Sequence, residues 1–279
     1  MNPASATRAA DVLRELDRDR YLATLVLPAE QRDAITALYA FGTEIAGVRE
    51  RARDPAAGEI RLQWWTDALE GNGHGAVRAN PLADALLAAI ETYALPVAPL
   101  LRLIEARRFD LYQDAMPDVL TFEGYAGDTA SALYQLAAMV LNGGRPIEQG
   151  DAAGHLGVAH AMIGHLRAFG YNASQGRIFL PWAVLAANDV READVFAGKA
   201  TIELTAALEQ VGDIAGEHLV KAEAAIRAVP RQLRAVFAPV VVLRRQLWRA
   251  DLDWPFRRQE DIADWRKIAA LTWWRMRNG

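Results

Sequence analysis

The sequence predicts an all-α protein, a bundle of helices that folds as one domain over residues 1–279 around a central cavity. Leucine and alanine recur every three to four residues along nearly the whole chain, the spacing of one helix face. Segments that alternate apolar and polar residues, as strands do, are almost absent. Hydrophobic residues make up 52% and charged residues 24% of the chain, the composition of a folded protein. No break in composition divides it, so we expect a single domain.

Capping residues and glycines predict where individual helices begin and end. Asp54-Pro55 and Asn80-Pro81 each combine an N-cap with proline at the first helical position. Gly71 and Gly143-Gly144 are predicted helix ends. Further helices are expected from Ser5 to about Arg18, Pro28 to Val48, Thr121 to about Leu141, about Pro146 to Phe169, and Thr201 to Val229, with Pro230 starting another.

Net charge and cysteine content exclude several classes of function. A net charge of −4 and a pI near 5.8 provide no positive field for nucleic acid. The chain has no cysteine, which excludes disulfides and thiolate metal sites and favours a reducing cytoplasm. Residues 1–20 lack the apolar core of a secretion signal, and no run reaches the roughly 18 to 20 apolar residues of a membrane span. We expect a cytoplasmic protein, soluble or peripheral at the inner membrane.

Acidic residues are distributed unevenly along the chain. Aspartate and glutamate number 35, yet none occurs between Ala152 and Asn188. Large helical folds often place carboxylates one turn apart on inward faces to hold metal ions. The acid-free run therefore removes that type of metal site from a predicted helix and the loop after it. It contains the segment GRIFLP, Gly176 to Pro181.

Four segments resemble the squalene/phytoene synthase family and occur in the same order as they do there. They are YLATLVLPAEQRDAITALYAF (Tyr21 to Phe41), LQWWTDALEG (Leu62 to Gly71), RRFDLYQDAMPDVLTFEGYAGDTASALYQL (Arg107 to Leu136) and HLRAFGYNASQGRIFLP (His165 to Pro181). The C-terminal third is similar only in its helical character. The resemblance implies the isoprenoid synthase-like helical bundle of that family.

The same resemblance implies a chemistry for which this chain lacks most of the required residues. Family enzymes join two prenyl diphosphates head to head, and two aspartate-rich motifs on facing helices hold Mg²⁺ against the diphosphates. A diphosphate leaves only when hard cations neutralise its charge, and those cations need carboxylate oxygens. The first motif's positions are here Ala46, Gly47 and Glu50, and the second motif's are Ala168 and Asn172. We therefore expect no metal site and no cofactor, with Mg²⁺ required only if the chain is active after all.

Several other residues are candidates for contact with a ligand. They are Tyr39, Arg107, Asp110, Arg167, Tyr171 and Arg177. Arg167 matches the family's arginine just before the second motif, where a diphosphate would meet it and Arg177. Arg107 and Asp110 could line a residual cavity or form an ion pair within one helix. Tyr171 and Asn172 are typical of a simple turn or of a loop that faces a ligand.

Two functional hypotheses follow. The segments AFGTEIAGVRE and LRAFGYNASQGRIFLP resemble a non-catalytic branch of the family that includes an assembly factor of respiratory complex I. This implies a catalytically degenerate protein that assists complex I assembly, with a partner in that membrane complex, or a scaffold that binds a protein, an isoprenoid or a lipid. The alternative is a divergent prenyl transferase, whose apolar helices and retained arginines could still enclose an isoprenoid diphosphate.

The C-terminal segment WRKIAALTWWRMRNG combines tryptophans with cations. Its tryptophans are Trp265, Trp273 and Trp274, and Arg244, Arg245 and Arg249 precede it in the sequence. Aromatic residues among cations suit peripheral contact with a membrane or binding of an acidic partner. A last helix that packs its tryptophans inward and exposes its arginines also explains the pattern, and the helix dipole by itself favours cations in a last turn.

Overall fold

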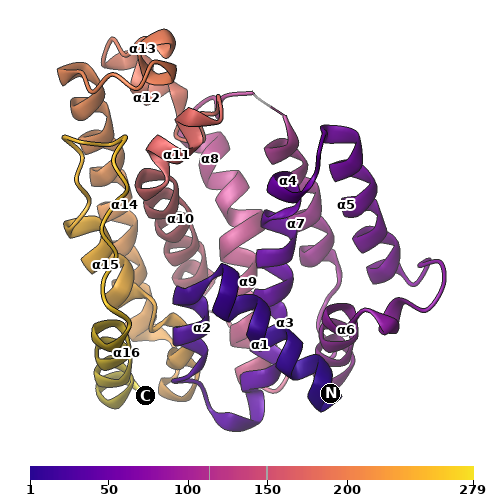
Figure 1. The fold of residues 1–279 in the computed structure, drawn as a ribbon. Coiled ribbons are helices and arrows are strands. Elements are labelled where there is room, and N and C mark those ends of the chain that lie inside the picture. Colours follow the sequence, from indigo (N-terminus) through magenta and orange to yellow (C-terminus); the bar gives the residue numbers. More distant parts are fainter. Residues whose placement is uncertain (113, 149) are drawn as a thin grey trace.

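Helices make up most of the computed structural model, which describes residues 1–112, 114–148 and 150–279 (Figure 1). No β-strand occurs in these ranges, so the predicted all-α class is confirmed. The first ten α-helices are α1 (Pro3–Leu16), α2 (Arg18–Thr24), α3 (Ala29–Ala46), α4 (Val48–Arg51), α5 (Pro55–Glu70), α6 (Pro81–Tyr93), α7 (Ala98–Arg108), α8 (Val119–Ala126), α9 (Ala132–Leu141) and α10 (Gly150–Arg167). The others are α11 (Phe169–Ser174), α12 (Trp182–Ala187), α13 (Glu192–Phe196), α14 (Ile202–Ala228), α15 (Val240–Trp248) and α16 (Asp264–Asn278). Shorter helical segments are η1 (Val77–Ala79), η2 (Phe109–Leu111), η3 (Gly127–Ser131) and η4 (Arg231–Phe237).

The predicted capping residues account for several helix ends. The Asp54 carboxylate accepts a hydrogen bond from Ala57 N at 2.9 Å, and the Asn80 side chain accepts one from Leu82 N at 3.0 Å. Each bond satisfies a donor that the first helical turn would otherwise leave free. Gly71 ends α5 with a φ of 79°, a left-handed conformation that costs glycine little.

Several predicted boundaries are wrong by a few residues, including that of the first helix, which begins at Pro3 rather than at Ser5. Asp118, rather than Thr121, caps α8, because its carboxylate accepts the hydrogen bond from Thr121 N at 2.8 Å. The predicted single helix to Leu141 is α8 and α9 joined by η3, a π-helical segment in which one extra residue widens the turn. The next helix begins at Gly150, not near Pro146, and ends at Arg167.

α10 is the central helix of the bundle, packing extensively on α14 and also on α9 and η3. A side chain at Gly157 of α10 would lie 2.4 Å from the backbone of Ser131, so only glycine permits this close approach to η3. The Ser131 hydroxyl donates to Gly154 O at 2.9 Å across the same contact. The interior is filled by large apolar side chains, of which Phe41, Trp65 and Phe122 are among the most deeply buried.

The helices are arranged so that α5 and the group α14, α15 and α16 lie on opposite flanks of the bundle (Figure 1). Both termini lie at one end of the molecule, and α4, α11 and α12 lie toward the other. The α3–α4 and α10–α11 junctions, which carry the degenerate motif positions, are therefore both near the end opposite the termini. In the part of the chain that the structure describes, no helix combines the length and apolarity needed to cross a membrane.

Candidate functional site

The first degenerate motif lies where one helix gives way to another. α3 ends at Ala46 and α4 begins at Val48; between them Gly47 N still donates to Thr43 O at 3.0 Å, and Gly47 O accepts from Arg51 N at 3.3 Å. The Glu50 side chain is 54% exposed, and the Arg49 guanidinium lies 4.0 Å from its carboxylate. The first motif therefore supplies one solvent-facing carboxylate.

The second degenerate motif lies at a similar interruption. α10 ends at Arg167, and Ala168 has φ −93° and ψ 7°, outside regular helix geometry, before α11 begins. Asn172 is buried in α11, and its carbonyl accepts a hydrogen bond from Arg177 N at 3.0 Å. Tyr171 and Asn172 thus belong to a short helix, and the turn that follows it is closed by the Asn172 backbone rather than by a metal ligand.

The residues at these positions do not fit the Mg²⁺ that the family enzymes require. Mg²⁺ is bound through oxygen ligands, chiefly carboxylates supplemented by water and substrate phosphates. Ala46, Gly47 and Ala168 have no side-chain oxygen, and Glu50 is the one carboxylate at the motif positions. Across residues 1–112, 114–148 and 150–279, no group of three or more His, Cys, Asp or Glu is arranged to hold a metal ion.

A buried polar cluster, made of Arg107, Asp110 and Tyr125, joins η2 to α7 and α8. Arg107 Nη1 donates to Asp110 Oδ2 at 2.9 Å and to the Tyr125 hydroxyl at 2.6 Å, and that hydroxyl donates to Asp110 Oδ1 at 2.8 Å. Burial raises the pKa of Tyr125 well above its usual range, so the phenol keeps the proton that it donates. Burial by itself would lower the pKa of Arg107, but Tyr125 and Asp110 outweigh it and raise that pKa. The geometry supports the ion-pair interpretation of Arg107 and Asp110.

Arg49 and two aromatic rings lie beside this polar cluster. The Arg49 guanidinium carbon lies 4.9 Å from the centroid of the Phe179 ring, and Phe179 stacks on His165 at 4.8 Å. Burial lowers the pKa of Arg49, and the nearby Arg177 lowers it further, although a guanidinium still keeps its charge. Burial also lowers the pKa of His165 to about 4, which leaves the imidazole neutral at pH 7. Fixed cations and aromatic rings therefore stand next to the first motif.

Arg177 opens onto a surface pocket of about 360 Å³ together with Arg49. The pocket is lined by Arg49, Ala52, Arg53, Asp54, Pro55, Leu111, Tyr112 and Arg177. Three arginines face one acidic residue, and Asp54 already caps α5. The pocket has the charge to attract an anion, and a metal–diphosphate complex would meet cations where it needs carboxylates.

Arg167 and Tyr171 belong to a different pocket. Arg167 Nη2 donates to Asp261 Oδ1 at 3.0 Å, which ties α10 to the segment before α16. Arg167, Ala168 and Tyr171 line a pocket of about 560 Å³ with Gly164, Gly170, Arg257, Arg258 and Gln259. The two arginines that a diphosphate was expected to meet, Arg167 and Arg177, thus line separate pockets.

Tyr39 lies in a third environment, inside the core. Its ring is 6.4 Å from that of Tyr134 in an edge-to-face arrangement, and the Arg20 guanidinium carbon lies 5.7 Å from its centroid. The Tyr134 hydroxyl is 2.8 Å from Nδ1 of His160, whose pKa burial lowers to about 3. Burial also raises the pKa of Tyr39. The candidate ligand residues are therefore divided among three places in the fold.

Sequence reasoning missed four residues around the degenerate motif. They are Arg49, Tyr125, His165 and Phe179. Arg49 stands beside Glu50 in AFGTEIAGVRE, and a cation next to the last motif carboxylate was a signal against metal binding. Phe179 is the aromatic residue of GRIFLP, but its contact with Arg49 depends on tertiary packing that spacing does not reveal.

The comparisons with known proteins agree with the predicted family and fold. The squalene/phytoene synthase family model matches residues 13–253. The chain belongs to the squalene/phytoene synthase family. It is also 27% identical over 269 residues to the 15-cis-phytoene synthase of Synechococcus elongatus, with 90% of this chain and 86% of that protein covered.

Relatives described as assembly factors are at least as similar. The chain is 29% identical over 254 residues to "NADH dehydrogenase (ubiquinone) complex I, assembly factor 6" of Mus musculus, covering 90% of this chain and 76% of that protein. Against the human protein of the same description it is 28% identical over 246 residues, covering 87% and 74%. These matches have far stronger statistical support than the match to phytoene synthase.

Solved structures of squalene/phytoene synthase family members share the fold at low sequence identity. A dehydrosqualene synthase in complex with a ligand superposes with a TM-score of 0.82 at 19% identity, covering 96% of this chain and 94% of that one. A squalene synthase from Alicyclobacillus acidocaldarius gives a TM-score of 0.65 at 22% identity, covering 99% and 97%. The predicted isoprenoid synthase-like bundle is therefore confirmed.

Proposed function

We propose that this squalene/phytoene synthase family member is catalytically degenerate and assists the assembly of respiratory complex I. One observation carries the loss of catalysis: four of the five motif positions are Ala46, Gly47, Ala168 and Asn172, and both helices that bear them are interrupted there. A buried guanidinium, Arg49, stands beside the one remaining carboxylate. A diphosphate can leave only when bound cations neutralise its charge, and the motif positions lack the set of carboxylates that would bind those cations.

The complex I role is supported by the relatives. Proteins from mouse, rat and human with which this chain aligns over most of its length are described as complex I assembly factor 6. We propose that the whole of residues 1–279 forms one domain that meets a subunit of the complex or another assembly protein. We propose that the protein acts at the surface of the inner membrane, which it binds as a peripheral protein through the C-terminal Trp/Arg helix.

A divergent prenyl transferase is the second candidate, because the pocket beside Arg49, Arg53 and Arg177 has the charge to bind a diphosphate. Diphosphate binding in this pocket would leave the ion pair of Arg107 and Asp110 intact, in a structural role. It would also require some other group to supply the cation ligands. The acidic residue that lines this pocket, Asp54, is the cap of α5 and accepts a backbone hydrogen bond there.

Deletion of the gene in the organism that carries it tests the proposed role. We expect complex I to fall while complex II stays unchanged, as measured by native gel electrophoresis and by NADH-dependent quinone reduction in isolated membranes. The wild-type gene and a Glu50→Gln variant should restore complex I equally, because Glu50 is exposed and performs no metal chemistry. Normal complex I in the deletion strain would remove the assembly role. Restoration by wild type alone would show that Glu50 retains a specific task.

A further inference from the structure

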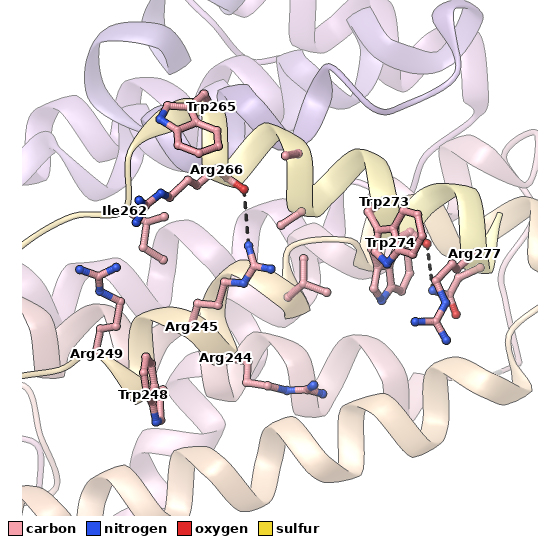
Figure 2. Close-up of a pocket in the computed structure, with 14 residues that line it drawn as sticks. Arg244, Arg245, Trp248, Arg249, Ile262, Trp265, Arg266, Trp273, Trp274 and Arg277 are labelled. Atoms are coloured by element: carbon pink, nitrogen blue, oxygen red, sulfur yellow. Dashed lines mark hydrogen bonds between the residues drawn. The ribbon is translucent and has the colours of Figure 1, made fainter.

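The largest cavity described near the C-terminus is a groove between α15 and α16, which we name the Trp/Arg groove (Figure 2). Its volume is about 640 Å³. The lining consists of Val241, Arg244, Arg245, Trp248, Arg249, Ile262, Trp265, Arg266, Ala269, Ala270, Trp273, Trp274, Arg277 and Asn278. Small and branched apolar residues alternate with tryptophans and arginines, and no Asp or Glu is among the lining residues that the structure describes.

The tryptophans of this groove are exposed to a degree that folding does not explain. Trp248, Trp265 and Trp273 are 85%, 67% and 61% exposed, and Trp274 alone packs against the core. The interpretation in which the last helix turns its tryptophans inward is therefore wrong for two of its three. Indole rings are costly to leave in water, so several at one place mark a surface that another partner covers.

The arginines of the groove differ in how far they are engaged. Arg244 forms an ion pair with Glu223, and Arg249 lies 3.9 Å from the highly exposed Glu260. Arg245 reaches the carbonyl of Arg266 at 3.4 Å, and the Arg266 guanidinium carbon lies 5.2 Å from the Trp265 ring centroid. Neither of these contacts neutralises charge, and Arg277 faces the groove at its other end (Figure 2). The groove thus presents unneutralised guanidinium groups among indoles.

α16 is held firmly enough to present this surface. Lys267 is 1% exposed and donates to Asp261 Oδ2 at 2.6 Å and to the carboxylate of Asp19 in α2. Arg275 donates to the carbonyl of Val26, on the same side of the helix. These contacts use the inner face of α16, which leaves Trp265, Trp273 and the arginines Arg266 and Arg277 exposed.

We propose that the Trp/Arg groove is a docking surface for a membrane rich in anionic phospholipid, with lipid phosphates bound by Arg245, Arg266 and Arg277. Guanidinium groups pair with phosphate oxygens in bidentate geometry, and tryptophan prefers the headgroup level of a bilayer. The groove is charged oppositely to such lipids and is lined by no competing carboxylate. This inference rests on the proposed function, since it gives the peripheral protein its contact with the membrane.

Flotation with vesicles tests the proposal. The full chain is mixed with vesicles of phosphatidylcholine alone, or of phosphatidylcholine with about 30 mol% phosphatidylglycerol, which gives the vesicle a negative surface potential. We expect binding to the anionic vesicles only, with a blue shift of tryptophan fluorescence, and release at high salt. Equal binding to both vesicles, or binding to neither, would overturn the proposal.

A charge-matched pair of variants isolates the groove. Arg245→Glu/Arg266→Glu/Arg277→Glu should weaken the vesicle partition coefficient by at least about 100-fold, since each basic residue near an anionic surface contributes roughly fivefold and reversal removes more. Arg8→Glu/Arg14→Glu/Arg102→Glu carries the same change in net charge on other exposed helix faces and should bind nearly as wild type does. Equal losses in both variants would overturn the groove assignment. Folding of each variant is checked by its urea midpoint.

The other occupant that the groove could suit is an acidic amphipathic helix of a protein. The probe, used in place of vesicles, is a synthetic amphipathic helical peptide with leucine on one face and glutamate on the other. Groove-dependent binding of that peptide without binding to anionic vesicles would overturn the lipid assignment. Complementation separates this from the function: if the wild-type chain restores complex I but does not bind anionic vesicles, the membrane surface is overturned and the assembly role stands.

Discussion

The arginines beside the degenerate motif and those of the Trp/Arg groove are surrounded in opposite ways. Arg107 is enclosed by Asp110 and Tyr125, and Arg49 is packed on Phe179. In the groove, by contrast, Arg245 and Arg266 meet only a backbone carbonyl and an indole ring at a surface. Arg107 therefore has its counter-ion within the fold, whereas Arg245 and Arg266 have none among the described residues and remain available to a binding partner.

This difference shows where a degenerate enzyme can keep function. An isolated buried charge is costly, so the buried guanidinium of Arg107 depends on its pairing with Asp110. Charge exposed at a surface carries no such penalty and can be kept for binding. Each prediction below changes one side of this comparison and measures the effect on stability or binding.

The largest effect is expected from Asp110→Ala. Removing the carboxylate leaves the buried Arg107 guanidinium without its counter-ion, and breaking one partner of a buried pair typically costs about 3–5 kcal/mol. Urea unfolding with an unchanged m-value measures the loss. Glu50→Ala is the control, since its exposed carboxylate should contribute within about 0.5 kcal/mol. Equal, small losses in the two variants would contradict a structural role for the buried cluster.

A smaller loss is expected from Lys267→Met. The substitution keeps the buried aliphatic stem but leaves Asp19 and Asp261 facing one another, and both are partly exposed, so we expect about 1–3 kcal/mol. The carboxylates are less enclosed than Asp110, which explains the smaller figure. Because this lysine fixes α16, binding to anionic vesicles should weaken as well. Loss of stability with unchanged vesicle binding would show that the groove does not depend on this anchor.

The neutral His165 makes stability depend on pH. Burial lowers its pKa to about 4 in the folded protein, against about 6.5 when unfolded. Between these values the unfolded state binds more protons, so stability is complete above pH 6.5 and falls as the pH drops toward 4. The slope is at most about 1.4 kcal/mol per pH unit for one histidine. His165→Phe should reduce the loss between pH 7 and pH 5 by about 1–2 kcal/mol in urea titrations, and an identical pH profile would contradict the buried, neutral imidazole.

The smallest effect on stability is expected from the groove. Arg245→Glu/Arg266→Glu/Arg277→Glu should change the free energy of unfolding by less than about 1 kcal/mol, because these arginines form no ion pair within the described residues. The same variant should lose vesicle binding. In the groove, therefore, substitution affects binding with little effect on stability, whereas at Asp110 it affects stability. A stability loss as large as that of Asp110→Ala would show that the groove arginines hold the fold together.

Much of the fold could be predicted from the sequence, because helical periodicity and capping residues are local signals. Asp54-Pro55, Asn80-Pro81 and Thr201 each mark a helix start that the structure contains. The cap at Thr121 was misplaced because Asp118, three residues earlier, offers a stronger acceptor. The π-helical segment η3 could not be predicted from local signals; it lies in close contact with Gly157 of α10, far along the chain.

For the candidate site, the sequence predicts which residue types stand at the motif positions better than it predicts where those residues lie in space. Loss of motif carboxylates at Ala46 and Ala168 can be read from the residues themselves. The interruption of both helices at those positions cannot, since alanine favours helix and neither Gly47 nor Ala168 provides a side-chain cap. Sequence spacing also does not reveal that Arg167 forms a hydrogen bond with Asp261, 94 residues away. Nor does it reveal that Arg167 and Arg177 line separate pockets.

The central claim is that the chain keeps the synthase fold but has lost the synthase chemistry. The most direct test is whether it releases pyrophosphate from farnesyl or geranylgeranyl diphosphate. The purified chain is incubated with either diphosphate and Mg²⁺, and pyrophosphate is measured by a coupled assay. We expect no Mg²⁺-dependent release above the protein-free background. Mg²⁺-dependent release that Arg177→Ala abolishes, while the urea midpoint of that variant stays unchanged, would contradict the claim.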